Sequence, residues 1–219
     1  MQRRDEDVEV RVAGATVAGH LIVPAHALGI VVFAHGSGSS RHSPRNRYVA
    51  EVLNQAGIAT LLFDLLTPDE ERDRANVFDI GLLASRLVDV TLWLAGQPAT
   101  RTLRVGYFGA STGGGAAVAA AADPRVAVSA VVSRGGRPDL AGSALSRITA
   151  PTLLIVGGRD LEVLDLNRRA QQAMEAADCT VAVVPGATHL FEEPGALERV
   201  AVLARDWFVD HLTARVQLP

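Results

Sequence analysis

The chain has 219 residues, of which 48% are hydrophobic and 21% are charged, and its formal net charge is −3. These values are typical of a globular protein with a substantial core, and we expect a single domain over residues 1–219. The negative charge argues against nucleic acid and against an anionic membrane surface as partners.

Cysteine use and hydropathy predict where the protein is located. The single cysteine, Cys179, leaves no internal disulfide and favours a reducing compartment. The charged residues 1–9 lack the apolar centre of a signal peptide, and no apolar run reaches the ~20 residues that a membrane-spanning helix needs. We therefore expect a cytoplasmic protein.

The order of the predicted elements indicates an α/β fold. Alternating apolar residues at 8–12 and 17–23 predict a β-hairpin that turns at 13–15. Further strands are predicted at residues 30–34, 58–63, 105–108, 126–133, 151–157 and 180–184. Helices are predicted at residues 46–56, 78–95, 114–122, 164–177 and 194–211, with an exposed loop at 65–75.

This alternation of strands and helices predicts a mainly parallel sheet, led by the antiparallel hairpin and with helices on both faces. Ligands bind such sheets at the carboxyl ends of the strands. Residues that carry chemistry should therefore follow strands.

The sequence Gly109-Ala110-Ser111-Thr112-Gly113 lies between a predicted strand and a predicted helix. A serine in such a sharp turn projects its hydroxyl at the strand end, and the two glycines allow strand and helix to approach closely. The unpaired N–H groups and partial positive charge of the helix start suit a developing oxyanion. We predict that Ser111 is a nucleophile.

A second loop, from His35 to Ser40, follows the strand at 30–34. Its glycines allow the Ser37 backbone N–H to turn toward Ser111, where it would form an oxyanion hole with the N–H of Thr112. The alternative is a turn of small residues that only caps the next helix. We expect His35 to support this loop through hydrogen bonds and not to act as a base.

An acidic residue and a histidine follow the last two predicted strands. Asp160 comes after the strand at 151–157, and it could orient a histidine or cap the following helix. Glu162 and Asp165 are rivals for the first role. His189, in the loop before the final helix, is the candidate general base.

The chain order Ser111, Asp160, His189 is that of the α/β-hydrolases. With His35-Gly36-Ser37-Gly38 and the Gly-x-Ser-x-Gly turn, the chain resembles that superfamily over nearly its whole length, and in particular small, cap-less, dienelactone hydrolase-like members. The resemblance implies acyl transfer to water without metal or organic cofactor, with triad roles for the three residues. Dienelactone hydrolases proper carry a cysteine nucleophile, so Ser111 argues against dienelactone as the substrate.

The expected activity is that of a serine hydrolase, in the first place a carboxylesterase for small or short-chain esters. A thioesterase, lactonase or peptidase would use the same triad. The alternatives from other classes are a nucleotide- or phosphate-binding module and a catalytically silent scaffold. No loop ends in Gly-Lys-Ser/Thr, which argues against the module.

Several arginines near the expected site have open roles. Arg134 and Arg137 could bind an anionic group of the substrate, but we favour an exposed basic loop for them. Arg41, Arg45 and Arg47 either line the pocket or form a solvated helix start. The stretch 134–150 is short and rich in glycine, so we expect no large cap above the site.

Overall fold

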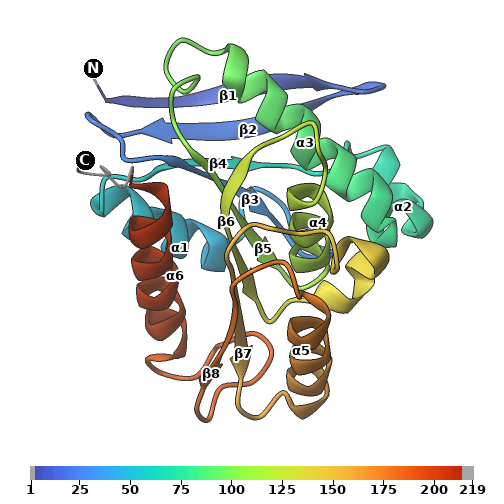
Figure 1. Ribbon diagram of the computed structural model, residues 1–219. Coiled ribbons are helices and arrows are strands. Elements are labelled where there is room, and N and C mark those ends of the chain that lie inside the picture. The colour runs from blue at the N-terminus through green and yellow to red at the C-terminus, as the bar shows by residue number, and fades with distance from the viewer. Residues whose placement is uncertain (1–2, 214–219) are drawn as a thin grey trace.

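The computed structural model describes residues 3–213, and these form an eight-stranded sheet flanked by helices (Figure 1). The strand order is β1-β2-β4-β3-β5-β6-β7-β8. β2 pairs antiparallel with β1 and β4, and the pairings from β4 to β8 are parallel. The strands are β1 (Arg4–Val12), β2 (Ala15–Val23), β3 (Ile30–Ala34), β4 (Ala59–Phe63), β5 (Val105–Ala110), β6 (Val128–Arg134), β7 (Thr152–Gly157) and β8 (Cys179–Val184).

Helices cover both faces of this sheet, as predicted. α1 (Pro44–Gln55) and α6 (Ala196–Leu212) pack together on one face, while α3 (Ile80–Gly96), α4 (Thr112–Ala121) and α5 (Leu161–Ala173) lie on the other (Figure 1). Each face has its own apolar core, with Val49 and Phe208 buried in one and Leu87 and Val118 buried in the other. The helices therefore hold the central strands in a dry interior.

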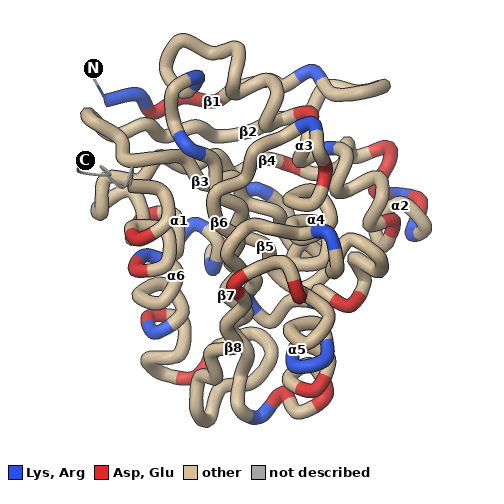
Figure 2. Tube along the Cα trace, viewed as in Figure 1, with Lys and Arg blue, Asp and Glu red and all other residues tan. Residues whose placement is uncertain are grey.

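The central strands are apolar because both of their faces are covered. All five residues of β3 are buried, and neither β3 nor β5 contains a charged residue. Figure 2 shows the charged residues on the helices, the loops and the outer strands. Within residues 3–213, no helix is both long enough and apolar enough to cross a bilayer.

The predicted absence of a large cap is confirmed for the described residues. Between β6 and β7 the chain forms a short 3-10 helix, Pro138–Ala144, which is broken at Gly142 by a φ of 54°. This segment packs against α4 and α5 beside the sheet. The carboxyl ends of the strands thus carry loops and no helical domain.

The predicted helix at 78–95 is wrong at its start, because two helices meet there. α2 (Arg74–Phe78) ends before Asp79, and Asp79 caps α3 by accepting a hydrogen bond from the Leu82 N–H at 2.9 Å. Aspartate favours this cap because its carboxylate satisfies an amide that has no partner in the first turn. The predicted exposed loop at 65–75 is accordingly shorter and contains the 3-10 turn Glu70–Arg72.

Candidate active site

Ser111 lies in the turn between β5 and α4 with a φ of 51° and a ψ of −122°. A positive φ in a residue with a side chain costs about 1–3 kcal/mol, so the surrounding structure must hold it. The Ser111 N–H donates to the Arg134 carbonyl at 3.3 Å, and its own carbonyl accepts from Gly114 and Arg137 at 2.9 and 3.1 Å. These bonds fix the turn that presents the hydroxyl at the start of α4.

The two glycines that flank Ser111 are required by close backbone approach. A Cβ at Gly109 would lie 2.6 Å from the Cα of Gly114 in α4. A Cβ at Gly113 would lie 2.6 Å from the carbonyl oxygen of His35. Both contacts are closer than carbon atoms tolerate, and both partners are backbone. The predicted reason for this spacing, a tight crossing of strand and helix, is confirmed.

Asp160 and His189 meet at the same edge of the sheet. The His189 Nδ1 lies 2.7 Å from an Asp160 carboxylate oxygen. A carboxylate only accepts hydrogen bonds, so Nδ1 carries a proton, and in the neutral ring Nε2 then holds the free lone pair. This arrangement gives His189 the tautomer that a general base needs.

The structure also distinguishes Asp160 from Asp165 as the partner of a histidine. Asp160 occupies the N-cap position of α5, but among the described residues its side chain caps no helix amide. Asp165 instead pairs with Arg169 at 2.7 Å. Asp160 is therefore the carboxylate that contacts His189.

Ser111 and His189 lie beside the same short segment, Arg134–Gly135. The carbonyl of Arg134 accepts from Ser111, while a Cβ at Gly135 would lie 3.6 Å from His189 Cε1 and 3.1 Å from the His189 carbonyl oxygen. Gly135 also has a φ of 51°, which favours glycine. From the sequence, residues 134–137 were considered only as a possible anion-binding loop, and the contact of Gly135 with His189 was not predicted.

The loop that carries His189 is held by a side chain that the sequence analysis also missed. Both carboxylate oxygens of Glu193 accept from the Thr188 N–H at 3.1 Å. Hydrogen bonding to Thr188, above all to its side chain, and to backbone amides lowers the pKa of Glu193. Phe191 adopts a φ of 56° in the same loop and is buried. The loop is thus fixed on both sides of His189.

The loop expected to provide the oxyanion hole passes close to Ser111. A Cβ at Gly36 would lie 3.1 Å from the Ser111 Cβ, so Ser37 follows a residue in direct contact with the turn. Thr112 is the first residue of α4, where amides have no partner within the helix. The structure therefore brings both predicted donor segments to Ser111.

His35 anchors this loop, as predicted. Its Nε2 accepts from the Leu65 N–H at 3.0 Å, and its Nδ1 lies 3.0 Å from the Gly36 carbonyl oxygen. Both ring nitrogens are engaged with backbone, so the ring must stay neutral. Burial lowers the pKa of His35 below its ordinary value of 6.5.

The pKa of His35 predicts a loss of stability in acid. Below about pH 6.5 the unfolded chain takes up a proton at this residue and the folded chain does not, so stability falls as pH drops toward the folded-state pKa. In urea unfolding at roughly pH 7.5 and pH 5.5, we expect His35→Gln to lose less stability on acidification than the parent. The same exchange at exposed His42 is the control, and an unchanged pH dependence in His35→Gln would contradict the assignment.

Arg134 is buried, so the favoured exposed basic loop is wrong for this residue. β6 runs one residue farther than predicted, and Arg134 pairs with Ala110 and Ile155 in the sheet. Burial, and to a smaller extent the charge of Arg45, lowers the pKa of Arg134 to about 10. Arg137 is partly exposed and pairs with Asp139 at 2.8 Å.

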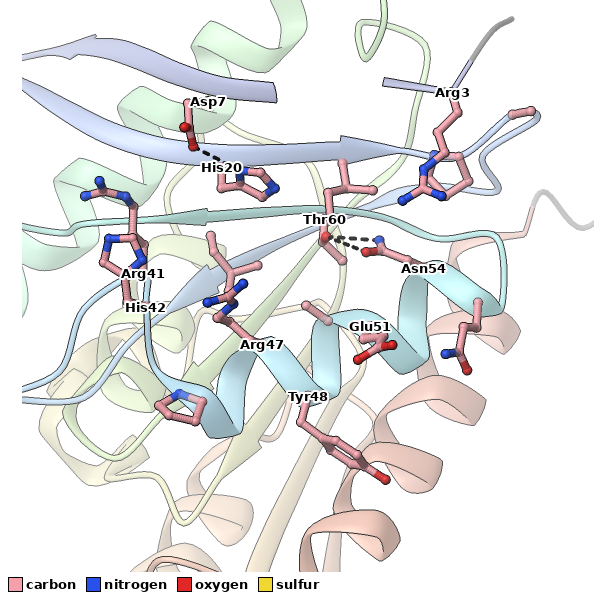
Figure 3. Close-up of a pocket in the computed structure, with 17 residues that line it drawn as sticks. Arg3, Asp7, His20, Arg41, His42, Arg47, Tyr48, Glu51, Asn54 and Thr60 are labelled. Atoms are coloured by element: carbon pink, nitrogen blue, oxygen red, sulfur yellow. Dashed lines mark hydrogen bonds and ion pairs between the residues drawn. The ribbon is translucent and has the colours of Figure 1, made fainter. Parts of the chain in front are cut away.

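The three arginines at the start of α1, Arg41, Arg45 and Arg47, lie in different surroundings. Arg45 lies 3.3 Å from Glu192, a neighbour of the His189 loop, and Arg41 pairs with Asp64 at the end of β4. Arg41 and Arg47 line a cavity of about 1130 Å³ between α1 and the first strands. Figure 3 shows His20 of β2 across this cavity from Arg47. None of Ser111, Asp160 and His189 lines it.

A smaller cavity of about 350 Å³ lies against the predicted oxyanion loop, although Ser111, Asp160 and His189 do not line it either. Its wall includes residues 35–40, and therefore Ser37. The rest of the wall is mostly apolar and comes from Leu65, Leu66, Glu71, Val77 and Leu83. This cavity is better placed than the larger one to receive part of a substrate bound at Ser111.

Cys179 is not part of the candidate site. Cys179 begins β8, at the strand end opposite the site, and burial raises the pKa of its thiol to about 12. A thiol of that kind is a poor nucleophile. Among residues 3–213, no three or more His, Cys, Asp or Glu side chains gather as a metal site would require.

Comparison with known sequences identifies the family. The dienelactone hydrolase family model matches residues 17–208. A putative phosphoribosyl transferase of Mycobacterium tuberculosis is 73% identical over 209 residues, which are 95% of this chain and 47% of that protein, so the chain spans about half the length of this relative. A probable 2-oxo-3-(5-oxofuran-2-ylidene)propanoate lactonase of Bradyrhizobium is 28% identical, over 68% of this chain and 69% of the relative.

Solved structures agree with this match. The crystal structure of a dienelactone hydrolase from Anabaena variabilis is 58% identical, covers 97% of this chain and 100% of its own, and has a TM-score of 0.92. Est1E from Butyrivibrio proteoclasticus, at 16% identity over 94% of this chain and 98% of its own, shares the fold with a TM-score of 0.80. On the sequence match and the site geometry together, the chain belongs to the dienelactone hydrolase family.

Proposed function

We propose that this chain is a serine-dependent carboxylic ester hydrolase that acts on small or short-chain esters. The observation that carries the proposal is the strained turn at Ser111 together with the 2.7 Å contact between Asp160 and His189 at the same sheet edge. A strained residue persists only where neighbouring structure holds it, and such residues cluster at functional sites. A silent scaffold would need neither feature.

In the proposed reaction, His189 Nε2 takes the proton of the Ser111 hydroxyl while the Ser111 oxygen attacks the ester carbonyl carbon. The N–H groups of Ser37 and Thr112 hold the resulting oxyanion, and Asp160 stabilises the imidazolium. The intermediate collapses, and His189 returns the proton to the departing alcohol. Water then attacks the acyl-enzyme with His189 as base, which releases the acid and restores Ser111.

A lactone is the second candidate substrate, because the Bradyrhizobium relative is named a lactonase and a lactone is a cyclic ester. Thioesters and peptides would use the same residues. The mycobacterial relative, which is named as a putative phosphoribosyl transferase, is about twice as long as this chain. The segment that the two proteins share includes residues that match the dienelactone hydrolase family. We therefore do not extend that activity to this chain.

We propose that the protein acts on a small-molecule ester in the cytoplasm and binds neither nucleic acid nor a membrane. The overall charge of −3 and the lone cysteine support this proposal.

The proposal predicts a preference for short acyl chains. The cavity beside Ser37 holds about 350 Å³, and no cap in the described residues extends its apolar wall. Each methylene gains about 0.8 kcal/mol only where a wall buries it. In a comparison of acetate, butyrate, octanoate and palmitate esters, we expect kcat/KM to be highest for one of the two shorter chains. Palmitate as the best substrate would contradict the open pocket, and no turnover of any ester would contradict the esterase.

A further inference from the structure

The predicted oxyanion loop, residues 35–41, is tied at both ends to two consecutive residues that follow β4. At its start, the His35 Nε2 accepts from the Leu65 N–H at 3.0 Å. At its end, one carboxylate oxygen of Asp64 accepts from the Arg41 backbone N–H at 2.8 Å, and the other oxygen pairs with the Arg41 guanidinium. His35 and Asp64 therefore hold the loop from opposite ends.

The middle of the oxyanion loop lies beside open space. Ser37 and Gly38 are exposed, and the cavity of about 350 Å³ lies between the loop and an apolar wall that includes Leu65 and Leu66. At the end of the loop, Arg41 lines the larger cavity (Figure 3). The position of the loop therefore depends strongly on the contacts at residues 35 and 41.

Asp64 is itself fixed by the sheet. It directly follows the last residue of β4, and its N–H donates to the Ala18 carbonyl of β2 at 3.0 Å. The side chains of Asp64 and Arg41 are 19% and 26% exposed, so water screens their ion pair less than it screens a pair on the open surface. The carboxylate is thus a firm support for the end of the loop.

The oxyanion loop contacts the turn that carries Ser111. A Cβ at Gly36 would lie 3.1 Å from the Ser111 Cβ, and Ser37 follows Gly36 with the N–H that we expect to bind the oxyanion. Such a donor is effective only at about 2.7–3.1 Å from the oxyanion, and a misplacement of about 1 Å can cost roughly 100-fold in rate. Movement of the loop therefore affects the reaction directly.

We propose that Asp64 is a positioning residue for the reaction. By holding the backbone and the guanidinium of Arg41, it sets the position of the oxyanion loop and thereby the direction of the Ser37 N–H. This inference rests on the proposed esterase function and extends it to a residue that acts through the loop and not on the reacting atoms.

Asp123 provides a matched control within the same chain. Its carboxylate accepts from the Arg125 backbone N–H at 2.9 Å and pairs with the Arg125 guanidinium at 2.8 Å, and its side chain is 25% exposed. It follows the ten-residue helix α4, whose first turn adjoins Ser111, so it lies about 15 Å from the Ser111 turn at 1.5 Å per residue. The same pairing is therefore present away from the candidate site.

The first experiment compares the kinetics of Asp64→Ala and Asp123→Ala on a butyrate ester. For Asp64→Ala we expect kcat to fall about 10- to 100-fold and KM to change less than about twofold, because the oxyanion forms after the ester has bound. Titration to completion with a fluorophosphonate counts the intact sites, so unfolded protein does not lower the kcat per site. Asp123→Ala should match the parent protein.

A double-variant cycle tests whether the effect passes through Arg41. Asp64→Asn keeps an acceptor for the Arg41 N–H but loses the ion pair, so its loss in kcat should be smaller than that of Asp64→Ala. In an Arg41→Met background, Asp64→Asn should lower kcat by less than about twofold, because the pair is already absent. Losses that multiply in the double variant would contradict a role through Arg41.

Amide hydrogen exchange measures the position of the loop without reference to catalysis. The Ser39 N–H donates to the Gly36 carbonyl at 3.2 Å within the loop and does not contact Asp64. We expect this amide to exchange about tenfold faster in Asp64→Ala and at the parent rate in Asp123→Ala.

These measurements separate positioning from a structural role and from failure of the proposed function. A lower Tm and fewer titratable sites, with normal kcat per site, would overturn the proposal, as would unchanged Ser39 exchange. If the parent protein hydrolyses no ester, the esterase proposal fails, and Ser39 exchange still decides whether Asp64 holds the loop.

Discussion

Replacement of Ser111 by alanine is expected to reduce ester hydrolysis by about 10⁴- to 10⁶-fold, because the hydroxyl that we propose forms the acyl-enzyme is lost. Loss of a nucleophile leaves only the rate that the oxyanion hole and substrate binding provide. Steady-state kinetics with a butyrate ester measure this change. Alanine keeps the Cβ, so the turn at φ 51° persists and Tm should change little.

Two measurements accompany this exchange. A fluorophosphonate probe should label the parent protein and not Ser111→Ala, whereas a nucleotide-binding module or a silent scaffold would not react at all. Ser111→Gly should be equally inactive but more stable, because glycine adopts a positive φ without strain. Near-normal turnover by Ser111→Ala would refute the mechanism.

The second large effect is expected for Asp160→Asn, with kcat lowered by about 10³- to 10⁴-fold. The amide has almost the shape of the carboxylate, but it can present an N–H to His189 Nδ1 and thereby favour the wrong tautomer. It also removes the charge that stabilises the imidazolium. Steady-state kinetics over a range of ester concentrations separate this loss in kcat from any change in KM.

Asp165→Asn is the matched control for this exchange. Asp165 lies on the same helix and pairs with Arg169, so its replacement should leave kcat unchanged. Because the Asp160 side chain caps no amide of α5 in the described structure, Asp160→Asn should also leave Tm nearly unchanged. A variant that lost stability but kept its activity would show that Asp160 is only a helix cap.

Local patterns in the sequence determined most of the architecture and the location of the site. Apolar runs predicted the buried strands, because a strand covered on both faces holds mostly apolar side chains. Glycines two residues before and after Ser111 predicted the tight turn, which the close contacts at Gly109 and Gly113 explain. Parallel strands end at one edge of a sheet, so residues that follow separate strands were expected to gather there.

Side-chain partners were decided only by the tertiary structure. The sequence favoured Asp160 over its rivals Glu162 and Asp165, but only the tertiary structure brings its carboxylate into contact with His189, which lies 29 residues farther along the chain. The burial of Arg134 depends on its register with β5 and β7. Arg45, whose charge acts on Arg134, comes from α1, which precedes both β4 and β5 in the chain. Burial and pairing are properties of contacts between distant segments, and these contacts exist only once the strands are assembled.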